Sequence, residues 1–387
     1  MTVTPNKHIA VLLLCVAAAA CMQACRKGEE PAAQPTVTAV APAAPGEEPI
    51  KGFFLLNEGN MGSNKATLDW FDYETGQYSK NIFAQRNPGV VKELGDVGND
   101  IQIYGGKLYA VINCSHLVEV MDAGTARHIA TIPIPNCRYI TFSGGHAYVS
   151  SYAGKVQADP GARLGYVAKI DTALLAVVGE CSVGWLPEEM AVRGGRLYVA
   201  NSGGYRVPHY DSTVSVIDLN TFEEVKKITV AINLHRMEPD SHGNIWVTSR
   251  GDYGGAGAGI YIIDGNDAVS SLQLPVGNMA LCGDSLYTCG TVWNHATGSS
   301  TASFAIINTL TKSVVSNSFI TDGTGAAMQT PYGIAVNPDT REIYVTDAKN
   351  HVTPGTLYCF APGGTKRWEV TTGDIPAHIV FTRKKLI

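Results

Sequence analysis

The sequence GGKLYAV begins at Gly105, and two similar stretches, GGHAYVS and GGRLYVA, begin at Gly144 and Gly194. Each stretch is a small-residue turn followed by a strand with an aromatic residue at its centre. The aromatic recurs about every 47 residues, a period in the range of the four-stranded blades of β-propellers. Its positions are Tyr109, Tyr148, Tyr198, Trp246, Tyr287 and Tyr344.

Every repeat contains the parts of a four-stranded blade. A short apolar segment precedes the turn, as in residues 101–104, and a third strand that ends in Asp follows, as in residues 118–122. The next turn often reads Asp-x-x-Thr, a spacing that lets the carboxylate accept backbone N–H groups across the turn. The third-strand pattern occurs seven times, which predicts seven blades. These strands are expected near residues 67, 117, 166, 213, 259, 303 and 356.

The two ends of this region complete each other. Residues 53–58 have the pattern of a second strand with no first strand before it, and residues 377–381 have the pattern of a first strand with nothing after it. Pairing them closes the ring and leaves no open radial edge. We therefore predict an all-β, seven-bladed β-propeller over residues 51–387, closed by the C-terminal strand. A two-sheet sandwich is the alternative, but it does not explain this complementarity.

The composition agrees with a packed β-protein and excludes several other classes. Of 387 residues, 45% are apolar, 16% are charged and 41 are glycine, which is typical of many strands joined by turns. A net charge of −5 supplies no basic field for a phosphate backbone, so we expect no nucleic-acid partner.

The first 50 residues predict an export signal and a lipid anchor. Lys7 precedes the apolar run 9–20, which has the length of a signal-peptide core and is too short to span a bilayer. Cys21 and Cys25 each follow small residues as in a bacterial lipobox, and the charged segment directly after Cys25 favours Cys25. We expect a signal peptide over residues 1–24, lipidation at Cys25 and a flexible tether over residues 25–50. An ordinary secretory peptide is the alternative.

Long loops gather on one face of the predicted ring. Loops that follow the second strands and loops that enter the first strands open on the same side, and they are rich in Tyr, Trp, Asn, Arg and Gly. Such a surface suits a large, mostly uncharged ligand. The residues that we expect to contact this ligand are Asn57, Tyr152, Trp185, Tyr205, Arg236, Arg250, Trp293 and Tyr332.

The sequence carries no strong signal for catalysis, a metal or a cofactor. It has no G-x-S-x-G, H-E-x-x-H or Walker motif, so we expect a binding protein and not an enzyme. Histidines in the face loops have no shared ligand spacing for zinc. Five acidic residues near the channel mouth could hold Ca²⁺, act as acid and base, or bond backbone amides, and we expect the last. They are Asp96, Asp100, Glu188, Glu189 and Glu238.

Six cysteines remain after the predicted signal and anchor. An exported chain permits disulfides, and Cys114 and Cys137 end and begin neighbouring strands on the same face. Cys114–Cys137 is therefore the one disulfide that we consider possible, and buried free thiols are the alternative.

Three segments carry a resemblance to a known group of proteins. Residues 54–76, 90–122 and 136–157, with the stretch NEGNMGSN from Asn57, resemble the surface-exposed β-propeller lipoproteins of Bacteroidetes, which are YncE-like or of the surface-layer type. Within that group, the sequence looks most similar to the BtuG-like lipoproteins that capture cobalamin.

The resemblance implies a location, a ligand and a partner. It implies a lipoprotein held at the outer membrane by its lipid alone and facing the cell exterior. It also implies that cobalamin or another corrinoid binds as ligand, and that a TonB-dependent transporter receives it. A surface propeller for a glycan or a protein is the alternative reading, followed by a metal-dependent lyase or lactonase.

Overall fold

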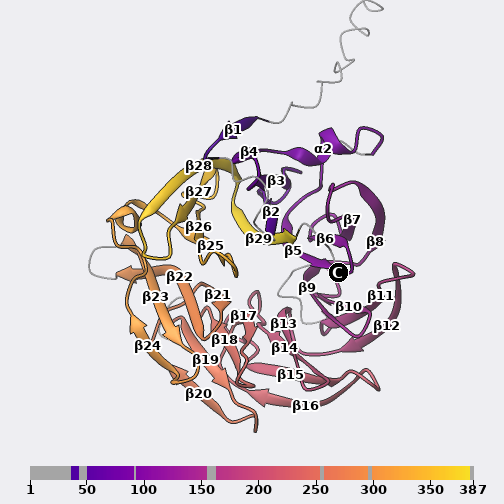
Figure 1. Ribbon diagram of the computed structural model, residues 1–387. Coiled ribbons are helices and arrows are strands. Elements are labelled where there is room, and N and C mark those ends of the chain that lie inside the picture. Colours follow the sequence, from indigo (N-terminus) through magenta and orange to yellow (C-terminus); the bar gives the residue numbers. More distant parts are fainter. Residues whose placement is uncertain are drawn as a thin grey trace, which may run out of the picture. The chain divides into compact units, whose positions relative to one another are not determined.

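The computed structural model describes residues 36–42, 50–90, 93–154, 163–252, 257–294 and 299–383. The predicted signal peptide and the cysteines Cys21 and Cys25 lie outside these residues. Seven antiparallel sheets are arranged around a central axis (Figure 1), which confirms the predicted seven-bladed propeller.

Each blade is an antiparallel meander whose first strand lies nearest the axis. Blade one combines strands from both ends of the propeller and is described last. The other six blades are each continuous in the sequence, and three of them are as follows. Blade two contains β5 (Gly98–Tyr104), β6 (Lys107–Ile112), β7 (Leu117–Asp122) and β8 (His128–Pro133). Blade three contains β9 (Cys137–Ser143), β10 (His146–Ser151), β11 (Tyr166–Asp171) and β12 (Ala176–Ser182). Blade four contains β13 (Pro187–Arg193), β14 (Arg196–Asn201), β15 (Thr213–Asp218) and β16 (Glu223–Thr229).

The remaining three whole blades have the same order. Blade five contains β17 (Leu234–Pro239), β18 (Ile245–Ser249), β19 (Gly259–Ile263) and β20 (Val269–Leu272). Blade six contains β21 (Asn278–Cys282), β22 (Ser285–Asn294), β23 (Ser299–Asn308) and β24 (Ser313–Ser316). Blade seven contains β25 (Pro331–Val336), β26 (Ile343–Asp347), β27 (Pro354–Phe360) and β28 (Lys366–Asp374).

Blade one joins the two ends of the propeller. Its innermost strand is β29 (Pro376–Arg383), which pairs antiparallel with β2 (Ile50–Asn57), as predicted. Outside them lie β3 (Thr67–Asp72) and β4 (Gln77–Ser79). In Figure 1 the yellow β29 accordingly lies beside the indigo β2.

Part of the segment expected to be a tether is not free of the propeller. Strand β1 (Val37–Ala39) pairs with β4 and adds a fifth strand to blade one. The amides of Val40 and Ala41 both donate to the carbonyl of Gly76, and both side chains pack against the blade. The edge strand β4 offers unpaired backbone groups, so a weakly apolar segment can add to it without a core of its own.

The turn chemistry read from the sequence is present in the structure. Gly105 and Gly106 have φ of 55° and 76°, the left-handed conformation that a two-residue hairpin turn requires. Asp122 Oδ1 accepts hydrogen bonds from the amides of Gly124 and Thr125 and from the Thr125 hydroxyl. Asp72 and Asp218 make the same turn contacts.

The core lies between neighbouring blades and not inside a single sheet. Five of the six repeated aromatics are buried there and Tyr287 is partly buried, and Tyr109, for example, packs with residues of blades two and three. Two short helices lie outside the sheets, α2 (Ile82–Arg86) and the 3₁₀ helix η1 (Thr324–Ala327). Neither of these two helices, the ones in the described part of the chain, is long and apolar enough to cross a membrane.

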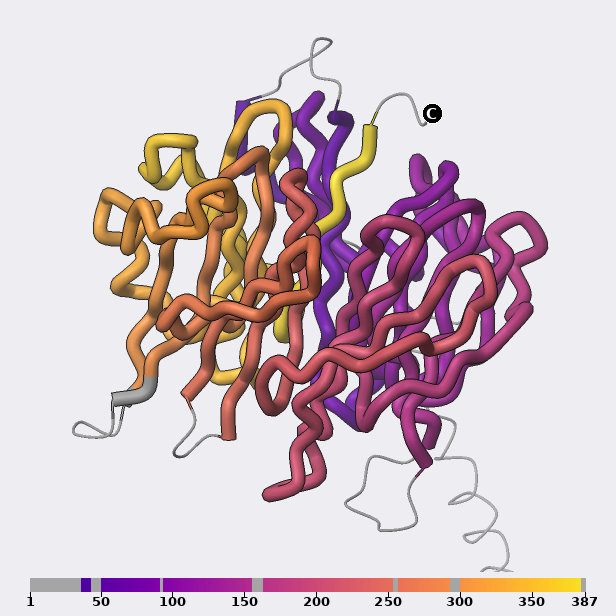
Figure 2. The backbone as a smooth tube through the Cα atoms, turned by 90° about the horizontal axis from the view of Figure 1, so that it is seen from below, coloured from indigo at the N-terminus to yellow at the C-terminus, as the bar shows by residue number. Residues whose placement is uncertain are grey.

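The loops that join second to third strands all open on one side of the ring. In Figure 2 this is the lower side, where the connection β14–β15 projects. The short Gly and Asp turns lie on the opposite side. We call the first side the mouth and the second the turn side.

Candidate functional site at the mouth

A β-bulge near the start of the first strand shapes the mouth. In six of the seven described blades the register between the first and second strands shifts there, so that the first strand carries one extra residue. In blade six the pairing of β21 with β22 is continuous. Bulges re-aim side chains and are frequent beside functional sites. The extra residues, called bulge residues below, are Asn99, Arg138, Glu188, His235, Tyr332 and Ala377.

A cavity of about 280 Å³ opens among these residues. Four bulge residues line it, together with side chains from the loops that follow the second strands. The lining consists of Glu58, Gly59, Asn60, Met61, Val97, Asn99, Asn113, Arg138, Tyr139, Tyr152, Tyr205, His235, Arg250, Tyr332 and Ile375.

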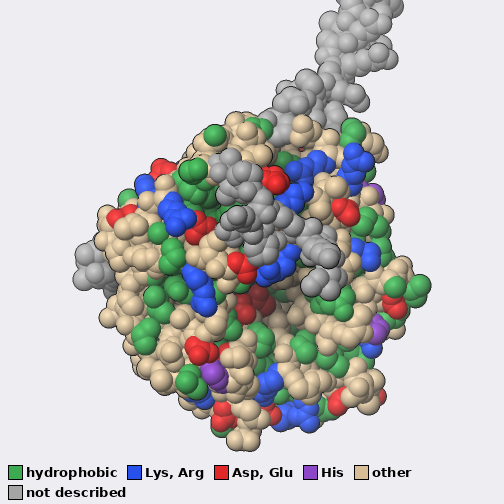
Figure 3. Space-filling view, in the orientation of Figure 1, with side chains coloured by type: hydrophobic (Ala, Val, Ile, Leu, Met, Phe, Trp, Pro, Cys, Tyr) green, Lys and Arg blue, Asp and Glu red, His purple; other side chains and the backbone are tan. Residues whose placement is uncertain are grey.

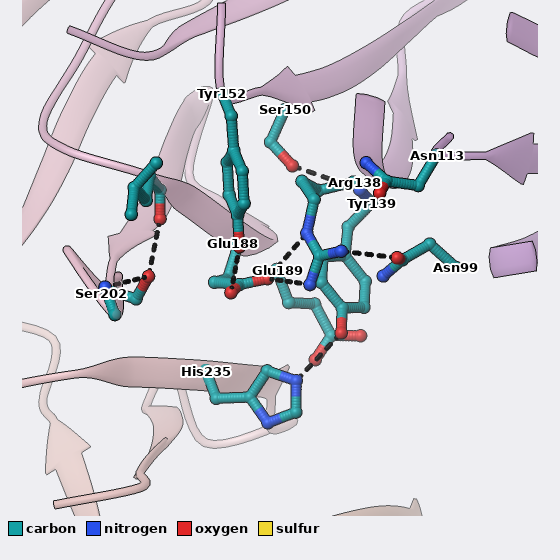
Figure 4. Close-up of polar contacts among 12 residues, drawn as sticks. Asn99, Asn113, Arg138, Tyr139, Ser150, Tyr152, Glu188, Glu189, Ser202 and His235 are labelled. Carbon is teal, nitrogen blue, oxygen red and sulfur yellow. Dashed lines mark hydrogen bonds and ion pairs between the residues drawn. The ribbon is translucent and has the colours of Figure 1, made fainter. Parts of the chain in front are cut away.

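One of these lining residues, Arg138, forms an ion pair with the bulge residue Glu188 (Figure 4). Arg138 donates from Nε and Nη2 to Glu188 Oε2, at 3.2 and 3.0 Å, and from Nη1 to Asn99 Oδ1 at 2.5 Å. The guanidinium also lies 4.8 Å from the ring centroid of Tyr152. A buried guanidinium needs such partners because its desolvation is costly. Strands of blades two, three and four are therefore tied together at one point.

The second oxygen of Glu188 is equally occupied. Oε1 accepts the Tyr152 hydroxyl at 2.5 Å and Arg250 Nη1 at 3.1 Å. Burial alone raises the pKa of Glu188, but the guanidiniums of Arg138 and Arg250 outweigh burial, so its pKa lies below the usual range. Glu188 is thus a fixed carboxylate at neutral pH.

Two further hydrogen bonds cross the ring from one blade to another. The Tyr139 hydroxyl lies 2.8 Å from His235 Nε2. Burial, followed by the nearby Arg250 and Arg236, lowers the pKa of His235 well below its usual value, so the ring is neutral. On the other side of the cavity, the Tyr332 hydroxyl donates to Glu58 at 3.1 Å.

A second polar layer lies one residue further along the first strands. Arg236 pairs with Glu189 at 3.5 Å and lies 5.1 Å from the Tyr139 ring, and His378 lies 3.7 Å from Asp100. Burial raises the pKa of Glu189 to about 7. Deeper still, burial and then the charge of Glu189 raise the pKa of Glu238 to about 8. The centre of the ring is also hollowed on the side seen in Figure 3, where acidic side chains are visible.

Four of the eight predicted contact residues line the cavity: Tyr152, Tyr205, Arg250 and Tyr332. Tyr205 is 53% exposed and stands at the rim, at 6.4 Å from the ring of Tyr152.

The other four lie elsewhere. Asn57 is fully buried and donates to Thr67 Oγ1, so it supports the pairing of β2 with β3. Trp185 stacks on Arg206 at 3.7 Å, and Arg236 belongs to the second layer. Trp293 is part of β22, but its side chain lies outside the described residues.

Sequence reasoning missed Arg138, Tyr139 and Glu58 as site residues. Arg138 and Tyr139 begin an otherwise apolar strand, and their position was assigned to the strand alone. Glu58 belongs to the NEGNMGSN stretch, in which Asn57 and not Glu58 was predicted to contact the ligand. A signal for these residues was present in the sequence. First strands start at the mouth with one or two residues that break the apolar pattern, and Arg138 and Tyr139 occupy such positions.

The acidic residues near the mouth behave partly as expected. Asp96 accepts the amides of Gly62 and Asn64, Asp100 accepts those of Ile101 and Ile140, and Glu189 accepts that of Met237. Glu188 differs, because it accepts hydrogen bonds from the side chains of Arg138, Tyr152 and Arg250. In the described part of the chain, no three His, Cys, Asp or Glu side chains group as a metal site would require.

Cys114 and Cys137, the pair considered for a disulfide, are both free thiols in the structure. The buried Cys137 Sγ contacts the backbone carbonyls of Ile112 and Leu117, whereas Cys114 Sγ contacts the side-chain oxygen Oδ1 of Asn113 in the turn after β6.

Several solved structures have a similar fold. A quinoprotein alcohol dehydrogenase-like protein from Bacteroides thetaiotaomicron has 15% identity and a TM-score of 0.59, with 86% of this chain and 78% of that chain covered. A hypothetical selenium-binding protein from Sulfolobus tokodaii has 12% identity and a TM-score of 0.63, with 87% and 94% covered. A putative 6-phosphogluconolactonase from Bacteroides fragilis has 11% identity and a TM-score of 0.60, with 88% and 100% covered.

At these identities the likeness concerns the fold alone. None of the curated proteins matches the sequence. One family model, described as a domain of unknown function, DUF5074, matches residues 51–367 and so spans nearly the whole ring. The chain therefore belongs to the DUF5074 family, with a seven-bladed β-propeller fold.

Proposed function

We propose that this protein is a surface lipoprotein that captures cobalamin or a related corrinoid at its mouth and passes it to a TonB-dependent transporter. The observation that carries the proposal is the position of the NEGNMGSN stretch. Residues 58–61 of that stretch, on which the resemblance to cobalamin-capturing lipoproteins depends, line the cavity.

The chemistry of the mouth suits such a ligand. A corrinoid is broad and nearly neutral, and it carries many amide groups, so it needs flat apolar contacts and a few orienting hydrogen bonds. Tyr205 and Met61 are 53% and 70% exposed and border the cavity, where they offer such contacts. The cavity is smaller than the roughly 300–1,000 Å³ that encloses a drug-sized ligand, so most of a corrinoid would lie across the rim.

Delivery requires the propeller to stay close to the transporter. Lipidation at Cys25 would hold the chain at the outer membrane, and a short linkage raises the effective concentration of one partner near the other. Residues 37–39 pair with β4 and so belong to the propeller. About ten residues then separate Cys25 from the propeller, and they would span roughly 35 Å when extended. Labelling with radioactive palmitate tests this step, and Cys25→Ala should abolish incorporation whereas Cys21→Ala should not.

Binding itself is tested with a soluble form that begins at Arg26 and so retains β1. This protein is mixed with cyanocobalamin, free ligand is removed on a desalting column, and the visible spectrum of the protein fraction is recorded. The proposal predicts a red fraction with one cyanocobalamin per chain. A colourless fraction at micromolar ligand would refute it and favour a glycan or a protein as the ligand.

Two tyrosines of one loop provide a matched pair of variants. Tyr205 lines the cavity, whereas Tyr210 of the same loop does not. Tyr205→Ser is expected to weaken cyanocobalamin binding at least tenfold, and Tyr210→Ser is expected to leave it within twofold. Equal losses in both variants would indicate a ligand site elsewhere on the loop.

A further inference from the structure

The charged side chains of the cavity cancel one another. Arg138 and Arg250 supply two guanidiniums to the lining, and Glu58 supplies one carboxylate. Glu188 is not part of the lining, but its carboxylate pairs with both arginines. His235 adds no charge because burial, followed by the nearby arginines, lowers its pKa. The mouth therefore presents many hydrogen-bonding groups around a formal charge of zero.

Such a cavity discriminates by charge. An ionised group that enters it loses hydration and finds no net opposite charge, since Glu188 pairs with both guanidiniums at 3.0 and 3.1 Å and Glu58 adds a second carboxylate to the lining. A carboxamide is uncharged and presents two donors and one acceptor oxygen, so it can bond tyrosine, asparagine and arginine groups at once. The tyrosine and asparagine lining is of this kind.

We infer that the cavity takes one uncharged propionamide arm of the ligand, while the ring of the ligand lies on the rim at Met61 and Tyr205. This inference rests on the proposed function and specifies which part of a corrinoid enters the site. It assigns to Glu188 the role of a specificity residue, because this carboxylate pairs with both arginines.

The test compares cyanocobalamin with its three monocarboxylic acids, in each of which one propionamide arm is hydrolysed. Dissociation constants are measured by equilibrium dialysis at pH 7.5. We expect at least one isomer to bind tenfold or more weakly than cyanocobalamin, because its acid replaces the arm that enters the cavity. Equal affinity of all three isomers and cyanocobalamin would overturn the inference and leave the proposed function intact. No binding of cyanocobalamin would refute both.

Variants that change the charge of the site should change the discrimination between amide and acid in a predictable direction. Glu188→Gln changes the formal charge of the site from zero to +1, so the discrimination against the weakest acid isomer should shrink at least fivefold. Glu119→Gln is the matched control, because Glu119 is a buried carboxyl of blade two that bonds His128 and Thr131 away from the cavity. It should keep the wild-type ratio, and an unchanged ratio in Glu188→Gln would contradict the inference.

A second variant guards against misfolding of the first. Arg250→Gln removes a cation whose side chain is 30% exposed, and it leaves a net negative cavity. The discrimination against the same acid isomer should then grow at least threefold. A smaller discrimination in this variant would overturn the inference even if Glu188→Gln fails to fold by circular dichroism.

Discussion

Two sets of equivalent positions in the seven blades have opposite characters. Near the turn side, the second strands carry a buried aromatic at the same place, as in Tyr109, Tyr148 and Tyr198. At the mouth, the bulge residues differ in size and charge from blade to blade, as in Asn99, Arg138 and Glu188. The repeated aromatics give similar packing between neighbouring blades, whereas the bulge residues, which differ from blade to blade, form the site at the mouth.

The largest expected effect is the difference in unfolding free energy between breaking an ion pair at the mouth and breaking one at the surface. Arg138→Met leaves Glu188 buried with Arg250 as its one remaining cation, and loss of one partner of a buried pair costs about 3–5 kcal/mol of unfolding free energy. Arg383→Met breaks an exposed pair with Asp339 and should cost about 1 kcal/mol or less. Urea unfolding of both variants measures the difference, and equal costs would show that the mouth pair is not structural.

A pair of Tyr→Phe variants compares the two regions with the same chemical change. The Tyr152 hydroxyl donates to the Glu188 carboxylate, so Tyr152→Phe should cost about 1.5–3 kcal/mol. The buried Tyr109 hydroxyl has no hydrogen-bond partner among the described residues, so Tyr109→Phe should be neutral or slightly stabilising. Thermal unfolding decides, and a larger loss for Tyr109→Phe would reverse the comparison.

The pH dependence of stability probes the channel between the two regions. Burial and then Glu189 raise the pKa of Glu238 to about 8, above the ordinary value near 4.3 of an unfolded chain. Between about pH 5 and pH 8 the native state holds a proton that the unfolded state has lost, so this group lowers stability as the pH rises through that range.

Glu238→Gln removes this titration and should therefore reduce the fall in melting temperature between pH 6 and pH 9 by a few degrees. Glu119→Gln, at a buried site outside the channel, serves for comparison. An identical fall in the wild type and Glu238→Gln would show that Glu238 does not titrate in this range.

The smallest effect is expected at a single turn. Asp122→Ala removes three hydrogen-bond acceptor contacts from one half-exposed Asp-x-x-Thr turn and should cost about 1 kcal/mol, with ligand binding unchanged. Because the turn is repeated around the ring, the other blades keep theirs. A loss of cyanocobalamin binding in this variant would show that the turn side contributes to the site.

The fold could be predicted because its signals are periodic. The aromatic of each second strand, the glycine turn before it and the Asp-x-x-Thr turn after the third strand each recur, so every blade repeats the evidence of the others. Closure by β29 followed from two incomplete patterns at the ends. Strand β1 was missed because its pairing depends on the open edge of β4 and not on its own composition.

The site could be predicted only in part because it depends on exceptions to that period. Tyr152, Tyr205 and Arg250 were found because they follow second strands, and Tyr332 was found because it lies where a loop enters a first strand. Arg138 and Glu188 meet because bulges in two different blades aim them at each other, and no spacing along the chain reports a bulge. Asn57 is the opposite case. It was predicted to contact the ligand because it belongs to a loop motif, but it is buried and donates a hydrogen bond to Thr67.

The most direct test of the central claim is a crystal structure with cyanocobalamin bound. The account predicts one ligand per chain at the mouth, with its ring on Met61 and Tyr205 and one amide arm within hydrogen-bond distance of the cavity lining. A ligand on the turn side or on the outer strands, with the cavity between Arg138 and Tyr332 unaltered, would contradict it.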